Sequence, residues 1–173
     1  MSVVPGDPAS VSACASTVQA LAVRLGSRSR GVEEAVRGVA EGWPGRVSVG
    51  TRRRGGALAD AGSTTAAELE RVAVVLQDHA TDLAALIARA RRLEETAATA
   101  GLQVRDRRVV PAYGIVGEAD PAADTERTHV ASALQVELDA LLARHARRRD
   151  WVLGVLRTST GELAAVSHAL RRG

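Results

Sequence analysis

The residue types that most often carry catalysis or bind metal ions are few in this chain and widely separated. The four histidines are His79, His129, His145 and His168, and the single cysteine is Cys14. No two histidines stand four residues apart, as in a helical zinc motif, and one cysteine supplies no thiolate cluster. The chain also lacks a Gly-x-Ser-x-Gly elbow, a Walker loop and a dinucleotide fingerprint. We therefore expect no catalytic residue, no cofactor and no metal site, and a protein that is not an enzyme.

His79 is the histidine with the most informative position, because it falls within an apolar series that includes Leu76 and Leu83. One interpretation is a core histidine that is hydrogen-bonded to a neighbouring group. The sharper hypothesis is a pH-responsive contact, because protonation would place a charge among apolar side chains.

Arginine supplies all 23 basic residues, and 20 acidic residues keep the net charge at +3. The arginines form four clusters, at 52–54, 89–92, 105–108 and 147–149. They alternate with acidic residues and have no interleaved aromatic residues for base stacking, which favours solvated helix faces and ion pairs over a nucleic-acid site. An anionic membrane surface or nucleic acid remains the alternative ligand for them.

Apolar residues recur at alternating intervals of three and four over two long stretches. In the first stretch they are Val11, Cys14, Val18, Leu21, Leu25, Val32, Ala35 and Val39, with Arg28 as a break. In the second they are Leu58, Thr65, Leu69, Val72, Leu76, His79, Leu83, Leu86, Ala90, Leu93 and Ala97. Such a stripe covers one face of a helix and needs a partner helix. Because Cys14 lies on the first stripe, we expect a buried, inert thiol.

The ends of these two helices follow from capping residues. Asp7 suits the N-cap and Pro8 the first helical position, so the first helix is expected from about Pro8 to Ala40. The second helix is expected to begin between Thr51 and Leu58, because glycines at positions 55, 56 and 62 weaken its first turns. Gly101 would end this helix near Ala100.

The pattern changes after Gly101. Residues 102–110 alternate apolar and polar side chains around a charged centre, which indicates a small β-hairpin. Asp120-Pro121 then repeats the cap-and-proline start, so a third helix should follow. Its apolar face would include Val130, Leu134, Leu138, Leu141, His145, Val152 and Val155. We favour a break between Thr158 and Gly161 that opens a short fourth helix, the alternative being one helix that continues through Gly161.

Between the first two helices stands Trp43-Pro44-Gly45. Proline and glycine end one helix and allow the chain to reverse, and the tryptophan ring would cover the end of the resulting hairpin. This Trp-x-Gly turn between two heptad helices resembles the WXG (ESAT-like) helical-hairpin superfamily of type VII secretion. The segment Ala100-Gly101-Leu102-Gln103-Val104 and the helix start at Asp120-Pro121 resemble an actinobacterial branch, in which a β-hairpin and a third helix precede secreted α/β-hydrolase-like or toxin domains.

These patterns predict an all-α bundle. It consists of a long antiparallel helical hairpin, a packed third helix with the short fourth helix after the break, and a small β-hairpin. The expected parts of this one structural domain are a WXG-like hairpin at 1–101, the β-hairpin and loop at 102–120, and the C-terminal helix or helices at 121–173. The contacts between helices, or with a partner, are expected at Val18, Leu21, Leu25, Leu69, Leu76, His79, Leu83 and Leu86.

The resemblance implies a non-enzymatic adaptor or substrate that pairs with a toxin, a hydrolase or a second WXG-type protein. The superfamily's export signal, Tyr-x-x-x-Asp/Glu, is not present, since the only tyrosine, Tyr113, is followed by Glu118 five residues later. A partner would therefore carry the signal. No basic-then-apolar leader and no stretch of roughly 20 apolar residues occurs, so we expect a protein without a membrane span that is cytoplasmic before export by a type VII route. The alternatives are a cytoplasmic Arg-rich coiled-coil binder of nucleic acid or of a regulatory protein, an isolated targeting module, and a homo-oligomer.

Overall fold

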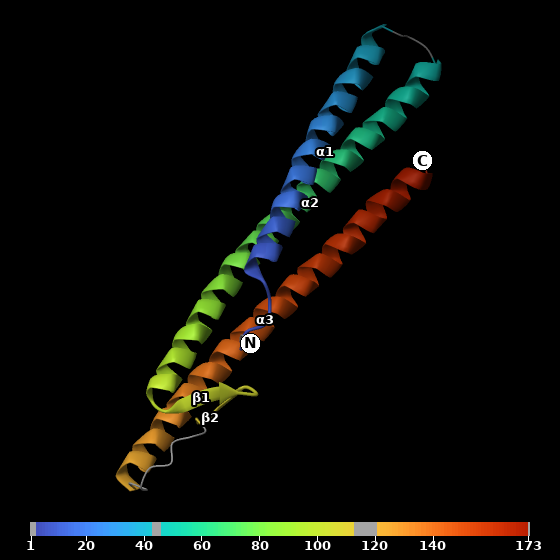
Figure 1. The fold of residues 1–173 in the computed structure, drawn as a ribbon. Helices are drawn as coiled ribbons and strands as arrows, with labels where there is room; N and C mark the ends of the chain where they lie inside the picture. The colour runs from blue at the N-terminus through green and yellow to red at the C-terminus, as the bar shows by residue number, and fades with distance from the viewer. Residues whose placement is uncertain (1–2, 43–45, 113–120, 173) are drawn as a thin grey trace. The chain divides into compact units, whose positions relative to one another are not determined.

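A computed structural model describes residues 3–42, 46–112 and 121–172 of the chain. These residues form three helices and one two-stranded sheet (Figure 1). The helices are α1 (Pro8–Gly42), α2 (Arg46–Thr99) and α3 (Pro121–Arg172), and the strands are β1 (Leu102–Arg105) and β2 (Arg108–Pro111). The prediction of a mostly helical chain with one small hairpin is confirmed. In the described part of the chain, no helix is both long and apolar enough to cross a membrane.

The capping residues correctly predicted where two of the three helices begin. Helix α1 begins at Pro8 and α3 at Pro121, as predicted, since a proline at the first helical position loses no hydrogen bond. The predicted start of the second helix was wrong, because α2 already begins at Arg46 and continues through all three glycines. Two of them have a packing role: a Cβ at Gly55 would overlap Val36, and one at Gly62 would overlap Ser29. The contact with α1 compensates for the low helix propensity of these positions.

The predicted break between Thr158 and Gly161 was also wrong, because α3 is continuous to Arg172. The hydroxyl groups in this segment, which could have capped a new helix, bond back along the same helix instead. Thr158 donates to the Gly154 carbonyl at 3.2 Å, and Ser159 donates to the Val155 carbonyl at 3.0 Å. Hydroxyls bonded to the carbonyl four residues earlier are compatible with an uninterrupted helix, so these residues do not act as caps.

The predicted β-hairpin is confirmed. Strands β1 and β2 pair antiparallel, with Leu102 opposite Pro111 and Arg105 opposite Arg108. Gly101, at a φ of 70°, ends the preceding helical segment, as its position suggested. The two turn residues, Asp106 and Arg107, both have positive φ angles, of 50° and 64°. This is the geometry of a tight two-residue hairpin turn, which asparagine and glycine normally occupy.

The contacts within the chain define two compact units, to which α2 and α3 both contribute. The first unit consists of Met1–Pro8 and His79–Asp150, and the second of Ala9–Asp78 and Trp151–Gly173. In the first unit, a buried cluster of five residues joins the N-terminal segment to both helices: Val4, Leu83, Leu86, Ala90 and Leu141. A second cluster lies beneath the β-hairpin: Leu93, Ala97, Leu102, Leu134 and Leu138.

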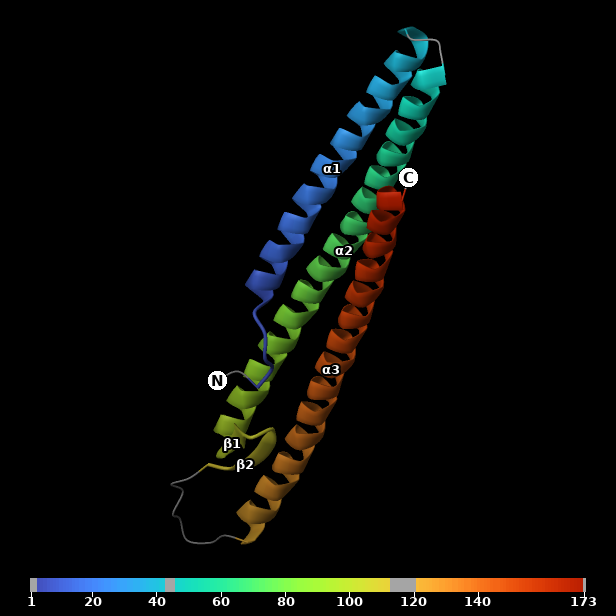
Figure 2. The ribbon, with the colours of Figure 1, turned by 90° about the vertical axis from the view of Figure 1, so that its right-hand side faces the viewer.

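In the second unit, α1 lies beside residues 46–78 of α2 (Figures 1 and 2). Their contacts have an antiparallel register. Near the start of α1, Ser12 donates to the side-chain oxygen of Gln77 at 3.0 Å, whereas near its end Val36 contacts the site of Gly55. The C-terminal part of α3 joins this unit through Arg71, which donates to the Ser159 hydroxyl at 2.9 Å.

Candidate functional site

The turn that suggested the superfamily, Trp43, Pro44 and Gly45, lies outside the described residues. So does Tyr113 in the loop after the hairpin. The helices on either side of the turn are described, and their packing bears on the predicted contacts between helices.

The contact of α1 with α2 is made by small side chains. On α1 the buried positions are Ala15, Ala22 and Ser29, each seven residues from the next. On α2 the facing positions include Gly62, which lies against Ser29, and Ala66, which lies against Gly26. Alanine, glycine and serine allow two helices to approach more closely than leucine does. Helices α1 and α2 can therefore approach closely because no large side chain lies along this line of contact.

The predicted contact residues of α1 lie beside this line rather than on it. Leu21 is 44% exposed, although its neighbour Ala22 is only 4% exposed. Val18 and Leu25 are half-buried. These three residues share one face of the helix, since they are separated by three, four and seven positions. We call Val18, Leu21 and Leu25 the α1 stripe.

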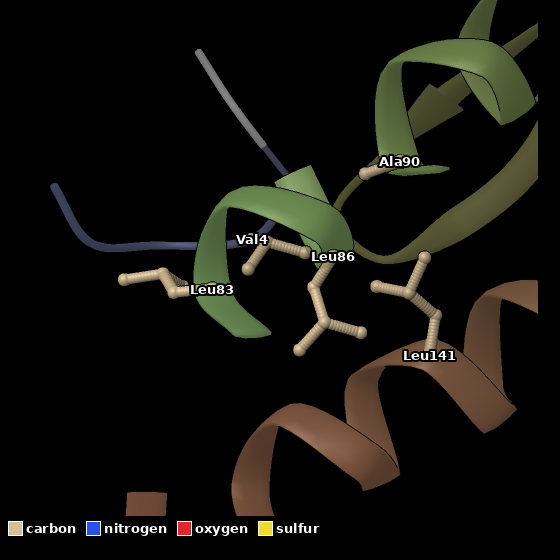
Figure 3. Close-up of a cluster of buried hydrophobic side chains, with 5 residues drawn as sticks. All are labelled: Val4, Leu83, Leu86, Ala90 and Leu141. Atoms are coloured by element: carbon tan, nitrogen blue, oxygen red, sulfur yellow. The ribbon is translucent and has the colours of Figure 1, made fainter. Parts of the chain in front are cut away.

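The predicted contact residues of α2 fall into two groups. Leu69 and Leu76, in the second unit, are half-buried. Leu83 and Leu86, in the first unit, are buried, and they meet Leu141 of α3 in the cluster shown in Figure 3.

Cys14 was predicted to be a buried, inert thiol, and this was wrong because the residue is exposed. Its neighbour Ala15 takes the buried position. The contact on α1 is shifted by one residue from the predicted stripe, and this shift turns Cys14 towards solvent.

Val4 is a core residue that the helix patterns did not reveal. It has no exposed surface and lies against Leu83 and Leu86 (Figure 3). The adjacent Gly6 has a φ of 127°, and a Cβ at this position would stand 2.9 Å from Cδ2 of Leu83. Both observations indicate that residues 3–6, which we call the N-terminal strap, are packed against α2. No periodic pattern precedes Pro8, so the sequence did not predict this contact.

Two of the histidines in the first unit are buried or half-buried. His145 of α3 is 8% exposed. His79 is half-buried, and its Nδ1 atom is buried without a hydrogen-bond partner among the described residues.

Burial and nearby positive charge lower the pKa of both histidines below 6.5. For His79, burial has the largest effect, followed by Arg148 and His145, while Asp82 acts in the opposite direction. For His145, burial again dominates, followed by Arg149, while the backbone of Pro5 acts in the opposite direction. Asp82 is engaged by Arg148 at 2.9 Å, so it only partly offsets the positive charge near His79. Both rings are therefore uncharged at neutral pH.

A polar cluster in the second unit connects α2 with α3. Glu68 accepts a hydrogen bond from Arg71 at 3.0 Å, and Arg71 also donates to Ser159. Hydrogen bonds with Arg71 and then with Ser159 lower the pKa of Glu68 from 4.5 to about 2. The cluster is a closed network of partners, which is typical of a structural contact between helices.

The other candidate sites offer few side chains that could bind a ligand. Among the described residues, no three His, Cys, Asp or Glu side chains lie close enough together to hold a metal ion. A hollow of about 700 Å³ lies between the β-hairpin and α3, with Leu102, Val109 and Gln135 in its lining. The charged residues that line it, Asp124 and Arg127, pair with each other at 2.9 Å.

Some arginines of the clusters pair with acidic neighbours. Arg89 pairs with Glu137 at 2.8 Å, and Arg149 pairs with Asp150 at 2.8 Å. These pairs agree with the interpretation of the clusters as solvated helix faces with ion pairs.

Exposed apolar bulk is concentrated in the second unit. Nine large apolar side chains are exposed among the described residues: Leu21, Val23, Val49, Leu58, Val74, Val136, Trp151, Leu153 and Leu170. All of them except Val136 belong to the second unit. Comparisons of the chain with protein-family models, with curated proteins and with solved structures give no match.

Proposed function

We propose that the protein is a non-enzymatic helical pairing protein of type VII secretion, acting as an adaptor or as an exported substrate. Its partner is another helical protein, which is a WXG-type protein, a toxin or a hydrolase. The observation that carries this proposal is the exposure of Leu21 beside the buried Ala22. Helix α1 uses its small residues to contact α2 and leaves part of its larger apolar side chains uncovered.

The α1 stripe is suited to a helical partner. Val18, Leu21 and Leu25 repeat at the spacing by which one helix packs along another. Burying an exposed leucine contributes about 1.5–3 kcal/mol, so a few such residues are sufficient for a specific contact when the flanking charges match. Arg24 and Arg28 on the same helix are exposed and would set the register against acidic residues of the partner.

The membership in the superfamily rests on the helix arrangement together with the sequence motif. The antiparallel register of α1 with residues 46–78 of α2 supports the long helical hairpin that the superfamily has. The confirmed β-hairpin and the helix start at Pro121 support the branch with a third helix.

Co-expression with the products of the neighbouring genes tests the pairing. We expect one of these proteins to co-purify with the wild type and to be lost with Leu21→Glu. Val23→Glu is the matched control, because Val23 is 61% exposed on the same helix but faces another direction. Equal retention of the partner by both variants would show that the α1 stripe is not the binding surface.

Export is tested separately in a host with a working type VII system and in the same host with that system deleted. We expect the protein in the culture filtrate of the first host only when its partner is co-expressed, since the chain has no Tyr-x-x-x-Asp/Glu signal of its own. Retention in the cells of both hosts, with the partner present, would argue against the secretion role while leaving the pairing intact.

A further inference from the structure

A second exposed leucine lies beside α1, on the neighbouring helix. Leu58 of α2 is 51% exposed. Along α2 it stands between two contacts with α1, because Val36 contacts the site of Gly55 and Ser29 contacts that of Gly62. Leu58 is therefore level with the part of α1 that follows the α1 stripe.

Leu58 and the α1 stripe lie on the same side of the two packed helices. On α1, Leu25 precedes the buried Ser29 by four positions, and on α2 Leu58 precedes the contact position Gly62 by four. Because α1 and this part of α2 are antiparallel, positions with the same offset from the contact line turn to the same side of the pair. The α1 stripe and Leu58 therefore form one apolar surface, which we call the hairpin face. From Leu21 to the level of Leu58 this face is about 18 Å long, since a helix rises about 1.5 Å per residue.

Two arginines flank the hairpin face. Arg28 precedes Ser29 by one position and Arg54 precedes Gly55 by one, so both lie on the side of the face. Both are exposed, and neither forms an ion pair with another described residue. The adjoining sequence offers no acidic partner, since residues 8–32 and 46–59 contain neither Asp nor Glu. Negative charge beside this apolar surface must therefore come from another molecule.

The charges and the burial of the hairpin face favour one kind of occupant. A second copy of the chain would place the same arginines against Arg28 and Arg54, and like charges across an interface are unfavourable. Nucleic acid would leave the leucines uncovered, and residues 8–42 and 46–59 supply no aromatic side chain for base stacking. A flat anionic bilayer would reach the exposed leucines better than the half-buried Leu25 beside α2. A helix reaches both, because its side chains insert between those of the face.

We propose that the hairpin face binds an amphipathic helix whose apolar side chains are flanked by aspartate or glutamate. Leu21 and Leu58 bury the apolar side chains of that helix, while Arg28 and Arg54 pair with its acidic flanks. Because the two arginines belong to different helices, together they fix the position of the bound helix across the face. This inference rests on the proposed pairing function and names the chemistry of the partner, but it does not depend on the secretion role.

Two synthetic peptides test the proposal without the natural partner. Each is a helix of about 16 residues with leucines at intervals of three and four, and a staple on the opposite side keeps it helical. The flanking positions are glutamate in one peptide and lysine in the other. Fluorescence anisotropy at about 0.15 M salt, where charges are screened beyond about 8 Å, gives both dissociation constants. We expect the glutamate peptide to bind at least about fivefold more tightly, since two ion pairs replace two repulsions.

Charge reversal shows whether the flanking arginines cause this preference. The double variant Arg28→Glu with Arg54→Glu should bind the lysine peptide more tightly than the glutamate peptide. Arg30→Glu with Arg53→Glu is the matched control, because it changes the net charge equally at exposed positions that the helical periodicity turns away from the face. This control should retain the preference for the glutamate peptide.

A second pair of variants locates the apolar contact on α2. Leu58→Glu should weaken binding of the glutamate peptide by about tenfold or more, because a buried leucine is replaced by a like charge. Val49→Glu is the control. Val49 is 56% exposed on the same helix, but it lies nine residues from Leu58, which is two and a half helical turns and hence the opposite side.

Four results would overturn the proposal. The first is equal binding of the two peptides, and the second is equal weakening by Leu58→Glu and Val49→Glu. The third is no binding of either peptide. The fourth is binding to vesicles of phosphatidylglycerol and phosphatidylcholine that the reversal of Arg28 and Arg54 abolishes while peptide binding is unchanged, because a membrane would then be the occupant.

The co-expression experiment separates this inference from the proposed function. A partner that is lost with Leu21→Glu but retained with Leu58→Glu would leave the pairing function intact and contradict the hairpin face. A preference for the glutamate peptide without any co-purified neighbour would retain the hairpin face and contradict the proposed partner.

Discussion

Ser29 of α1 and Gly62 of α2 approach so closely that a Cβ at position 62 would overlap the Ser29 side chain. Substitution of Gly62 therefore has two opposing effects. Alanine favours the helix by about 1 kcal/mol, but a methyl group forced into a filled contact costs about 1–3 kcal/mol. Because the serine is itself buried, we expect the packing effect to dominate and Gly62→Ala to lower the free energy of unfolding, as measured by urea denaturation.

Gly56 is the control for this prediction. It belongs to the same helix, and no atom would lie within 4 Å of a Cβ at this position. Gly56→Ala should therefore raise the free energy of unfolding by about 0.5–1 kcal/mol. The same stabilisation in Gly62→Ala would mean that α1 and α2 do not pack through this point.

The same contact shows how far sequence patterns predicted the helix packing. The predicted stripe on α1 included Cys14 and Leu21, whereas the buried positions are Ala15 and Ala22. A search for large apolar residues selects leucine and valine, while close helix packing is determined by the smallest side chains. Arg28 interrupts the predicted stripe, whereas the next residue, Ser29, continues the buried line of Ala15 and Ala22. The interruption at Arg28 was therefore a sign of the shift by one residue.

Acid should weaken the contact between α2 and α3 through Glu68. Its pKa is lowered from 4.5 to about 2 in the folded protein, so the native state favours the carboxylate more than the unfolded chain does. This contribution to stability is complete above about pH 4.5 and is lost as the pH falls towards 2. Glu68→Gln should therefore have a lower Tm than the wild type at pH 6, and the difference should shrink as the pH falls from 4.5 to 2.5.

Glu70→Gln controls for the general effect of losing one carboxylate. Glu70 is exposed on the same helix, two residues away. We expect its Tm to follow that of the wild type over the whole pH range. A pH profile of Glu68→Gln that also follows the wild type would show that the network with Arg71 and Ser159 does not stabilise the fold.

His79 should make stability fall on the acid side of neutrality. Its pKa is below 6.5 in the folded protein, chiefly through burial, so the unfolded chain takes up the proton first. Stability is therefore complete above pH 6.5 and falls as the pH drops through 6.5 towards the lower native pKa. His79→Leu should lose less stability than the wild type between pH 7.5 and pH 5, as measured by thermal unfolding.

Two comparisons make this result specific. His129→Leu, at an exposed position, should retain the wild-type response. An equal pH response in wild type and His79→Leu would end the hypothesis of a pH-responsive contact at this position. The residual response of His79→Leu is assigned to His145, because its pKa is lowered in the same direction.

The histidines also mark the limit of what the sequence revealed about the site. The position of His79 in the apolar series was visible, and so was that of His145 on the third helix. The packing of Val4 against Leu83 and Leu86 was not, because four residues without periodicity carry no signal of what they pack against. The same limit applies to Thr158, Ser159 and Thr160. Their hydroxyls suit a helix cap and a helix interior equally well, and only the fold decides which role they take.

The hairpin turn offers a stabilising substitution. Asp106 and Arg107 both have left-handed backbone angles, which cost a residue with a Cβ about 1–2 kcal/mol and cost glycine almost nothing. Arg107→Gly should therefore raise the free energy of unfolding by about 1 kcal/mol, provided that the side chain contributes little elsewhere. Arg107 also lowers the pKa of His145, so its removal should make the acid loss of stability smaller as well. Urea denaturation at pH 7.5 and pH 5 measures both effects.

Arg105→Gly is the contrasting variant. Arg105 lies in strand β1 opposite Arg108, outside the positions with positive φ. Glycine in a strand costs backbone entropy without relieving any strain, so this variant should be less stable than the wild type. If both glycine variants lose stability to the same degree, the turn is not strained at Arg107. If only Arg107→Gly gains stability, the two-residue turn has the geometry that the φ angles indicate.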